Sequence, residues 1–252
     1  MSGVLPGSPA GAGRGLLRRD PVGASRARLA CFGWSARAWS RPWLDFVRAH
    51  PGLQLREALE IGAGSRSSLA PLLLDLAQRV ECSAHDAAML PAIEALNARV
   101  LSADERQRVV YTRQDARALS GCWDLIVLKS VLGGLHRMHD SSISDVHATI
   151  EGLQAHLNPG GLLVTLDNGR TALEPLLTRL GSRRNGWRFL RHEDFPPADA
   201  CYGFGVLSVG SAATRLGWLG RRIDDGLFLL DCVLSPWARR HAVLLHVYRR
   251  PA

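Results

Sequence analysis

From residue 57 to residue 166, short apolar segments alternate with longer amphipathic ones, and this alternation limits the folds open to the chain. Strands are predicted at 57–61, 79–83, 108–112, 123–128 and 162–166. Helices are predicted from the glycine turn to about residue 78, over 87–100 and over 143–157. Such alternation favours a doubly wound, mostly parallel α/β sheet that binds ligands at the carboxyl ends of its strands. Functional residues are therefore expected directly after strands.

The flanking segments add a helix before this pattern and two strands after it. A lead-in helix is predicted between Ser35 and the "HPG" at 50–52, because Trp39, Trp43 and Phe46 recur at helical spacing. After Asn168 we predict a helix at 171–180, a strand within 198–209, an amphipathic segment at 221–234 and a last strand at 241–250. The predicted sheet then has seven strands, with one antiparallel strand near the end.

The length of 252 residues suits one α/β domain preceded by a tail. Residues 1–30 are rich in Gly, Pro and Arg with Asp20 as their only acid, which predicts a disordered tail or, alternatively, an organelle-targeting segment. The domain is predicted to span 31–252, with its ligand-binding core at 55–170 and the substrate side with the C-terminal strands at 171–252. Five cysteines without a CxxC pair favour reduced thiols and a cytoplasmic protein, and no segment approaches the roughly 18 apolar residues of a membrane span.

The net charge of +8 raises the question of nucleic acid as a partner. Every basic residue except Lys129 is an arginine, and the arginines are scattered along the chain instead of forming one stripe. A scattered pattern does not make the concentrated basic face that nucleic-acid binding uses. Composition therefore argues against a nucleic-acid partner, and the sequence leaves the oligomeric state open.

The turn after the first strand, "EIGAG" at 60–64, combines two glycines with an acid. Gly62 and Gly64 let the backbone approach a ligand closely and expose amides at the start of the next helix. A pyrophosphate would be repelled by Glu60, and a dinucleotide site would prefer a glycine where Ser67 stands. Glu60 therefore favours a cationic ligand over a nicotinamide dinucleotide.

Four ordered motifs resemble those of the class I S-adenosylmethionine-dependent methyltransferases, which have a Rossmann-like fold. They are "EIGAG", "QDARAL" at 114–119, "WDLIVLKSVLGGLHR" at 123–137 and "LNPGGLLVTLDN" at 157–168, together covering about residues 55–170. With "ECS" and "YGFG", the set is similar to methyltransferases encoded in bacterial surface-polysaccharide gene clusters. The resemblance implies an enzyme that transfers a methyl group from S-adenosyl-L-methionine to a small molecule or saccharide, at oxygen in preference to nitrogen.

The resemblance also implies cofactor-binding residues. These are Glu60, Gly62, Ala63 and Gly64 along the methionine and ribose, Ser83 and Asp86 near the ribose, and Asp115 and Ala116 at the adenine. The second strand departs from the family, because Ala84 stands where an acid usually takes the ribose hydroxyls. Asp86 either replaces that acid or only caps the helix that it precedes, and Asp115 has the same capping alternative.

Lys129 and His136, which follow the predicted fourth strand, are candidates for catalysis. Lys129 can hydrogen-bond an oxygen of the acceptor or cofactor, and His136 can take the proton of an acceptor hydroxyl; a solvated lysine and a histidine placed by chance are the alternatives. Asp167 and Asn168 end the fifth strand, where some O-methyltransferases hold magnesium. Because Lys129 occupies the place of the second acid that those enzymes need, no metal is expected there.

Three other functions remain open. Ala84 is consistent with a protein that binds the cofactor without transferring its methyl group, and the positive charge with an RNA or protein methyltransferase. A nicotinamide oxidoreductase is disfavoured by Glu60 and Ser67. The motifs typical of nucleobase methylation, [D/N]PP[F/Y/W] and a Pro-Cys pair, are absent from the sequence.

Overall fold

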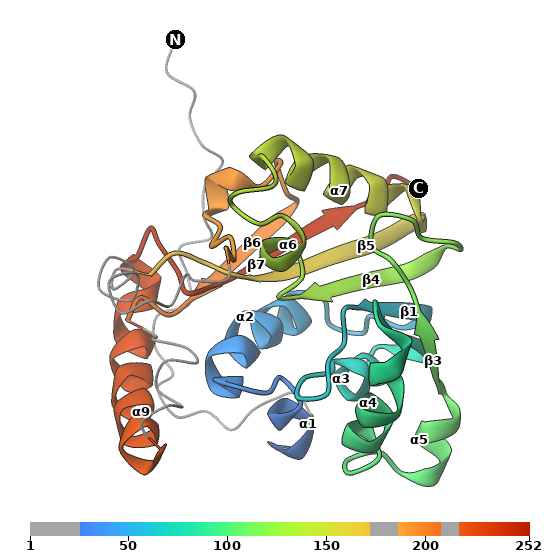
Figure 1. The fold of residues 1–252 in the computed structure, drawn as a ribbon, viewed down its shortest axis with the longest axis horizontal. Helices are drawn as coiled ribbons and strands as arrows, with labels where there is room; N and C mark the ends of the chain where they lie inside the picture. The colour runs from blue at the N-terminus through green and yellow to red at the C-terminus, as the bar shows by residue number, and fades with distance from the viewer. Residues whose placement is uncertain (1–25, 172–185, 208–216) are drawn as a thin grey trace.

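The computed structural model of the chain describes residues 26–171, 186–207 and 217–252 and shows one seven-stranded sheet (Figure 1). The strands are β1 (Leu55–Ile61), β2 (Ala77–Ala84), β3 (Val109–Arg113), β4 (Trp123–Lys129), β5 (Leu157–Asn168), β6 (Ala200–Phe204) and β7 (Val243–Arg249), in the order β3-β2-β1-β4-β5-β7-β6. Only β7 runs antiparallel to its neighbours, β5 and β6. The prediction of a doubly wound, mostly parallel sheet of seven strands is confirmed.

Helices cover both faces of the sheet (Figure 1). They are α1 (Arg26–Ala30), α2 (Ala36–Ala49), α3 (Ala70–Leu73), α4 (Leu90–Asn97), α5 (Ala103–Gln107), α6 (Leu132–Leu135), α7 (Ile143–Ala155) and α9 (Gly217–Leu234). Short 3-10 turns occur at η1 (Ala87–Met89), η2 (His192–Asp194) and η4 (Ser235–Trp237). Among the described residues, no helix is long and apolar enough to cross a membrane.

The strand β4 shows how the sequence divides the core into two layers. Successive side chains of a strand point to opposite faces, so Leu125 and Val127 join the cluster beneath α2 and α3, whereas Ile126 and Leu128 join the cluster beneath α7. All four side chains are fully buried. A continuous apolar run is what a central strand with two covered faces requires.

Several predicted boundaries are wrong. The helix after the glycine turn ends at Leu73, and β2 begins by Ala77, because residues 69–74 are buried on every side and carry no periodicity that would mark an end. The "NPGG" predicted as a turn belongs to β5, which begins at Leu157 opposite Trp123. The helix predicted at 87–100 is divided into η1 and α4.

The structure describes only part of the predicted tail and of the segments predicted after Asn168. Residues 26–30, predicted to be part of a disordered tail, form α1, where Arg28 pairs with Asp75 and Glu105. The remainder of the tail and almost all of the helix predicted at 171–180 lie outside the described residues. The strand predicted within 198–209 is β6, and the amphipathic segment at 221–234 belongs to α9.

Candidate active site

The glycine turn after β1 packs tightly against the side chain of Val131 and the backbone of β2. Gly62 has a φ of 80°, and a Cβ atom there would lie 2.4 Å from Cγ2 of Val131. The amides of Gly62 and Ala63 donate to the carbonyl of Ser83 at 3.1 and 2.9 Å. Only glycine therefore fits at position 62 without movement, whereas Gly64 has room for a side chain, since its Cβ would lie 3.9 Å from Met89.

Glu60 holds the turn to the helix that follows it. Its buried carboxylate accepts hydrogen bonds from the amide of Leu69 at 2.6 Å, the amide of Ala70 at 2.9 Å and the hydroxyl of Ser68 at 2.8 Å. Burial raises the pKa of Glu60, and these hydrogen bonds oppose that rise. The acid that the sequence assigned to a ligand therefore also has a structural task, the satisfaction of the first amides of α3.

The segment between α1 and α2 lies against the same turn. Ser67 donates its hydroxyl to the carbonyl of Phe32 at 3.1 Å, and the amide of Ser68 donates to the carbonyl of Cys31 at 3.0 Å. Gly33 has a φ of 80°, and a Cβ there would meet the carbonyl oxygen of Arg66 at 2.5 Å. These contacts hold the segment that carries Trp34 next to the glycine turn.

Lys129, at the carboxyl end of β4, points its ammonium at aromatic rings. The Nζ atom lies 4.4 Å from the ring centroid of Trp39 and 5.7 Å from that of Trp34, within the range of cation–π attraction. Lys129 is 7% exposed. Burial lowers its pKa to about 8, although Glu60 and Asp167 both favour the charged form. The alternative of a solvated lysine is therefore wrong.

Asp167 lies near the carboxyl end of the neighbouring strand β5, on the opposite face of the sheet from Lys129, and the two charges still act on each other. The side chain is 1% exposed, and neither carboxylate oxygen has a hydrogen-bond partner within the described part of the chain. Burial raises the pKa of Asp167 to about 7; the nearby backbone amides of residues 131–133, which do not reach hydrogen-bond geometry, and the charge of Lys129 oppose that rise. Ser130, between Lys129 and this amide group, has a φ of 54°, a left-handed conformation that costs about 1 kcal/mol or more.

We call Glu60, Lys129 and Asp167 the acid–lysine site. Their strands β1, β4 and β5 are neighbours and parallel, so the carboxyl ends meet at one edge, as the sequence predicted for functional residues. The indole rings of Trp34 and Trp39 lie beside the Lys129 ammonium, and the charges of Glu60 and Asp167 act on it. A buried position of this composition suits a cation, and a sulfonium ion has that charge.

The residues predicted at the ribose make local hydrogen bonds. The buried Ser83 donates its hydroxyl to the carbonyl of Glu60 at 2.7 Å. Asp86 is exposed and accepts from the amide of Ala88 at 2.9 Å, as the N-cap of η1. The buried Ala84 offers no polar group. The observed contacts of Asp86 are those of a cap, and its part in ribose binding stays a prediction.

The residues predicted at the adenine are also local. Asp115 accepts from the amide of Arg117 at 3.0 Å, which makes a turn after β3. Ala116 is half-buried and lies against the core beneath α7. Neither observation tests adenine binding, so both residues keep their predicted role as a hypothesis.

His136 lies at the end of α6, and its ring contacts α7. It is buried, and its Nε2 atom is 2.8 Å from the hydroxyl of Thr149 on α7. Burial lowers its pKa, and the charges that act on it are those of Arg117, Asp145 and Arg188, none of which acts on Lys129. The structure therefore brings Glu60 and Lys129 together but not His136. His139 and Asp140, which follow it, are exposed.

Sequence patterns gave no indication of the aromatic side of the site. Trp39 was predicted as a helix residue, and its spacing suits the core of any amphipathic helix, so nothing in the sequence connected it with Lys129. Asp167 was considered only as a metal ligand. The position of Asp167 at the end of a central strand could have indicated a ligand-binding role, because this fold binds ligands at that edge of the sheet.

Comparison with known proteins identifies the fold. No protein-family model and no curated protein matches the sequence. Among solved structures, the chain is similar to a putative sarcosine dimethylglycine methyltransferase from Galdieria sulphuraria, at 12% identity and a TM-score of 0.52 over 86% of this chain and 85% of that one. It is also similar to the N-methyltransferase NodS from Bradyrhizobium japonicum, at 12% identity and a TM-score of 0.51 over 86% and 96% of the two chains.

A third similar structure is phosphoethanolamine N-methyltransferase 2 from Haemonchus contortus in complex with S-adenosyl-L-methionine, at 16% identity and a TM-score of 0.51. That match covers 85% of this chain but 53% of the other, so the chain spans about half of that protein. The fold of this protein is that of the S-adenosylmethionine-dependent methyltransferases. At identities of 12–16%, the likeness establishes the fold and leaves cofactor, reaction and acceptor to the site.

Proposed function

We propose that this protein is an enzyme that binds S-adenosyl-L-methionine and transfers its methyl group to an oxygen of a small molecule or saccharide. The observation that carries the proposal is the acid–lysine site with its two tryptophans, at the edge of the sheet where this fold places its ligands. The proposal rests on the chemistry of this position together with the glycine turn beside it.

The residues divide into those that would hold the cofactor and those that would face the acceptor. Glu60, Gly62, Ala63 and Gly64 would lie along its methionine and ribose, with Ser83 and Asp86 near the ribose and Asp115 and Ala116 at the adenine. When bound, this cofactor supplies a methyl group already activated by its positive sulfur. The protein then has to align the acceptor with that methyl group and exclude water.

A hydroxyl acceptor also needs a proton acceptor. His136 is the base that the sequence suggests, but its Nε2 atom is engaged with Thr149. Asp167 has two buried oxygens without partners in the described part of the chain and a pKa near 7, which suits a general base at neutral pH. We therefore include Asp167 as a candidate base, with Lys129 positioning the acceptor oxygen.

Saccharides come first among the acceptors because of the motif similarity to methyltransferases of bacterial surface-polysaccharide gene clusters. Nitrogen is the alternative acceptor atom, and two of the similar structures are named N-methyltransferases. An amine acceptor is itself nucleophilic once deprotonated, so the same site could serve it. The assay below includes both kinds of acceptor for this reason.

A second candidate function is cofactor binding without methyl transfer. It is favoured by Ala84, which leaves β2 without a ribose acid, and by the capping contact that occupies Asp86. An RNA or protein methyltransferase is the third candidate, motivated by the net charge of +8. RNA binding of that kind would be strongly salt-dependent.

Incorporation of a labelled methyl group tests the proposal. Purified protein would be incubated with methyl-labelled S-adenosyl-L-methionine and panels of saccharides, hydroxylated small molecules, amines, RNA and proteins. We expect label in a saccharide or hydroxyl acceptor, with turnover at least about tenfold lower in Asp167→Asn than in the exposed control Asp140→Asn. Cofactor binding with no transfer to any acceptor would favour the second candidate. Label confined to amines, RNA or protein would contradict the oxygen proposal.

A further inference from the structure

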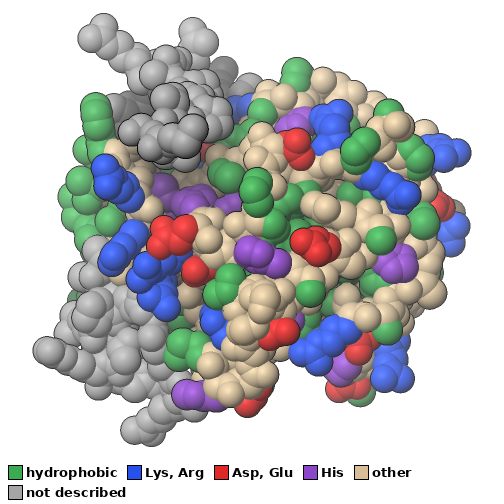
Figure 2. All heavy atoms as spheres, turned by 90° about the horizontal axis from the view of Figure 1, so that it is seen from above, with side chains coloured by type: hydrophobic (Ala, Val, Ile, Leu, Met, Phe, Trp, Pro, Cys, Tyr) green, Lys and Arg blue, Asp and Glu red, His purple; other side chains and the backbone are tan. Residues whose placement is uncertain are grey.

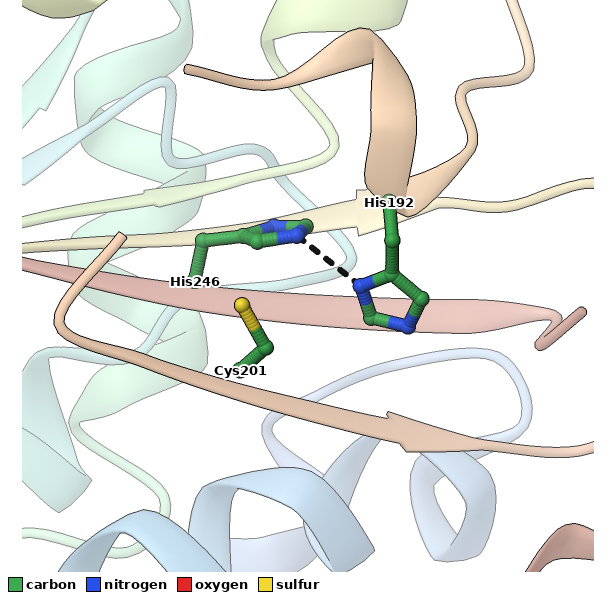
Figure 3. A group of neighbouring side chains, drawn as sticks. All are labelled: His192, Cys201 and His246. Atoms are coloured by element: carbon green, nitrogen blue, oxygen red, sulfur yellow. Dashed lines mark hydrogen bonds between the residues drawn. The ribbon is translucent and has the colours of Figure 1, made fainter. Parts of the chain in front are cut away.

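Three side chains from distant parts of the sequence meet at the β6 edge of the sheet: His192 of η2, Cys201 of β6 and His246 of β7 (Figure 3). One potential ligand atom from each lies within 4.8 Å of the other two. Cys201 and His246 are direct partners in the β6–β7 register, so the sheet itself fixes their distance. We call these three residues the histidine–cysteine cluster.

The histidines of the cluster form a hydrogen-bonded chain. Nδ1 of His192 lies 2.9 Å from Nε2 of His246, and Nε2 of His192 lies 3.3 Å from Nδ1 of His241. Nε2 of His241 lies 3.1 Å from the carbonyl of Ser235, which can only accept. If His241 is neutral, its Nε2 therefore carries the proton, its Nδ1 accepts from His192, and Nδ1 of His192 is left as a base facing His246.

Burial keeps these rings uncharged. It lowers the pKa of His192 to about 4 and that of His246 well below its usual value; His241 adds to the effect on His192, and His192 adds to the effect on His246. His246 is 1% exposed, and its Nδ1 atom has no hydrogen-bond partner among the described residues. A fully buried imidazole with an unpartnered nitrogen is costly for a protein core, which normally places apolar side chains there.

We propose that the histidine–cysteine cluster binds a divalent transition metal, with zinc as the preferred ion, through Nδ1 of His192, Nε2 of His246 and Sγ of Cys201. Two imidazoles and a thiolate are ligands that zinc takes in tetrahedral sites, leaving one position for water or another ligand. Nitrogens bound to one tetrahedral zinc lie about 3.3 Å apart, so the two rings would separate by a few tenths of an ångström.

Binding of the metal ion by the cluster involves no redox change. The metal accepts one lone pair from each ligand atom, His246 moves its proton from Nε2 to Nδ1, and Cys201 releases its thiol proton to water. Burial raises the pKa of that thiol, so the metal has to displace a proton that is otherwise held. His241 then orients His192 through the hydrogen bond to its Nε2 atom, as partners of metal-bound histidines do.

Two members of the cluster can be reached from the surface, since His192 lines a cavity and Cys201 is exposed. His192 and His241 line a cavity of about 200 Å³, and Figure 2 shows histidine, basic and acidic side chains gathered around a hollow on one face. Its charged lining residues are Arg170, Arg191, Glu193, Arg239 and Arg240. The excess of arginine opposes a dication, and the Cys201 thiolate removes one of its two charges. The ion would fasten η2 to the edge of the sheet.

The test is a zinc titration of the full chain after chelator treatment, in competition with a chromophoric chelator. We expect one equivalent of Zn²⁺ in the wild type, and an affinity at least about tenfold lower in Cys201→Ser. Cys122→Ser is the matched control, since Cys122 is also an exposed free cysteine but lies outside the cluster. Zinc should raise Tm in the wild type and in Cys122→Ser more than in Cys201→Ser.

Cobalt(II) gives a second measurement that reports the ligands directly. Thiolate-to-cobalt charge-transfer absorption should appear in the wild type and Cys122→Ser and be absent in Cys201→Ser. His192→Gln, at a half-buried position, should weaken binding similarly, with circular dichroism to verify folding. Absence of stoichiometric binding, or equal binding in Cys201→Ser and the wild type, would overturn the proposal. Neither measurement involves S-adenosylmethionine, so the result is independent of the proposed methyl transfer.

Discussion

The acid–lysine site and the histidine–cysteine cluster lie on one sheet, and burial favours the uncharged form of the groups in both, but it leaves their pKa values in different ranges. At the first, burial moves the pKa of Asp167 up to about 7 and that of Lys129 down to about 8. At the second, it moves the pKa of His192 down to about 4. Asp167 and Lys129 therefore change protonation state near neutral pH, whereas His192 stays uncharged there. The first suits a charged organic ligand, and the second suits donation of lone pairs.

The largest expected effect is the pH dependence of stability that Asp167 causes in the acid–lysine site. Asp167 is protonated in the folded state up to pH 7, whereas in the unfolded chain it ionises near 3.8. Between these values the folded state binds the extra proton, so this residue contributes stability at low pH that is lost as pH rises through 7. Relative to the wild type, Asp167→Asn should gain up to about 4 kcal/mol between pH 4 and pH 8.

Urea unfolding at each pH measures that difference. The exposed Asp140→Asn serves as the control and should follow the wild type throughout. Parallel stability curves for Asp167→Asn and the wild type would show that Asp167 is ionised normally in the folded protein, and the contrast between the two regions would then disappear.

A second expected effect concerns the structural task of Glu60. The amides of Leu69 and Ala70 donate to different oxygens of Glu60, so Glu60→Gln keeps one acceptor and places an NH2 group against the other amide. The free energy of unfolding should fall by about 3 kcal/mol, the cost of unsatisfied buried donors. Glu57→Gln changes an exposed acid of the same strand and should cost under about 0.5 kcal/mol. Equal losses in the two variants would mean that the hydrogen bonds of Glu60 do not hold the turn.

A third expected effect tests whether the acid–lysine site prefers a cationic ligand. S-adenosyl-L-methionine carries a sulfonium charge that S-adenosylhomocysteine lacks, so the ratio of their affinities isolates the response to that charge. In the wild type the ratio should rise about tenfold from pH 6.5 to 9, as Asp167 ionises and Lys129 loses its charge. Lys129→Met should show a higher ratio at pH 6.5, and Lys129→Arg, which stays charged, should show a smaller rise that comes from Asp167 alone. A ratio independent of pH in all three would place the sulfonium elsewhere.

The smallest expected effect decides between the two roles of Asp86. As the cap of η1, Asp86→Ala should reduce the free energy of unfolding by about 0.5–1 kcal/mol and leave cofactor affinity within about twofold. Calorimetry and urea unfolding on the same variant give both numbers. An affinity loss of about 1–3 kcal/mol with unchanged stability would instead make Asp86 the replacement for the ribose acid that Ala84 lacks.

The sheet could be predicted from the sequence because its strands are apolar segments separated by polar and amphipathic ones. The strands β1 to β5 were predicted within a few residues, except that the start of β5 was taken for a turn. Ends of helices were predicted less well, since the residues after the glycine turn are buried on all sides and show no period.

The two sites were predictable to different degrees for a physical reason. Glu60 and Lys129 lie at the carboxyl ends of neighbouring strands, so the order of the strands alone brings them together. Trp39 meets Lys129 only because α2 lies across the sheet, and His192, Cys201 and His246 lie 9 and 45 residues apart, with no ligand spacing to detect. Contacts of that kind depend on tertiary packing, which local patterns do not encode.

Calorimetric titration with S-adenosyl-L-methionine tests the central claim most directly. Gly62→Val and Gly52→Val form a matched pair, since both glycines have φ near 80°. A Cβ at Gly62 would meet Val131 at 2.4 Å, whereas one at Gly52 would meet no described residue within 4 Å. We expect saturable binding with one site in the wild type and in Gly52→Val, and at least about 100-fold weaker binding in folded Gly62→Val. Absence of binding to the wild type, or equal affinity in Gly62→Val, would contradict the assignment of this site to the cofactor.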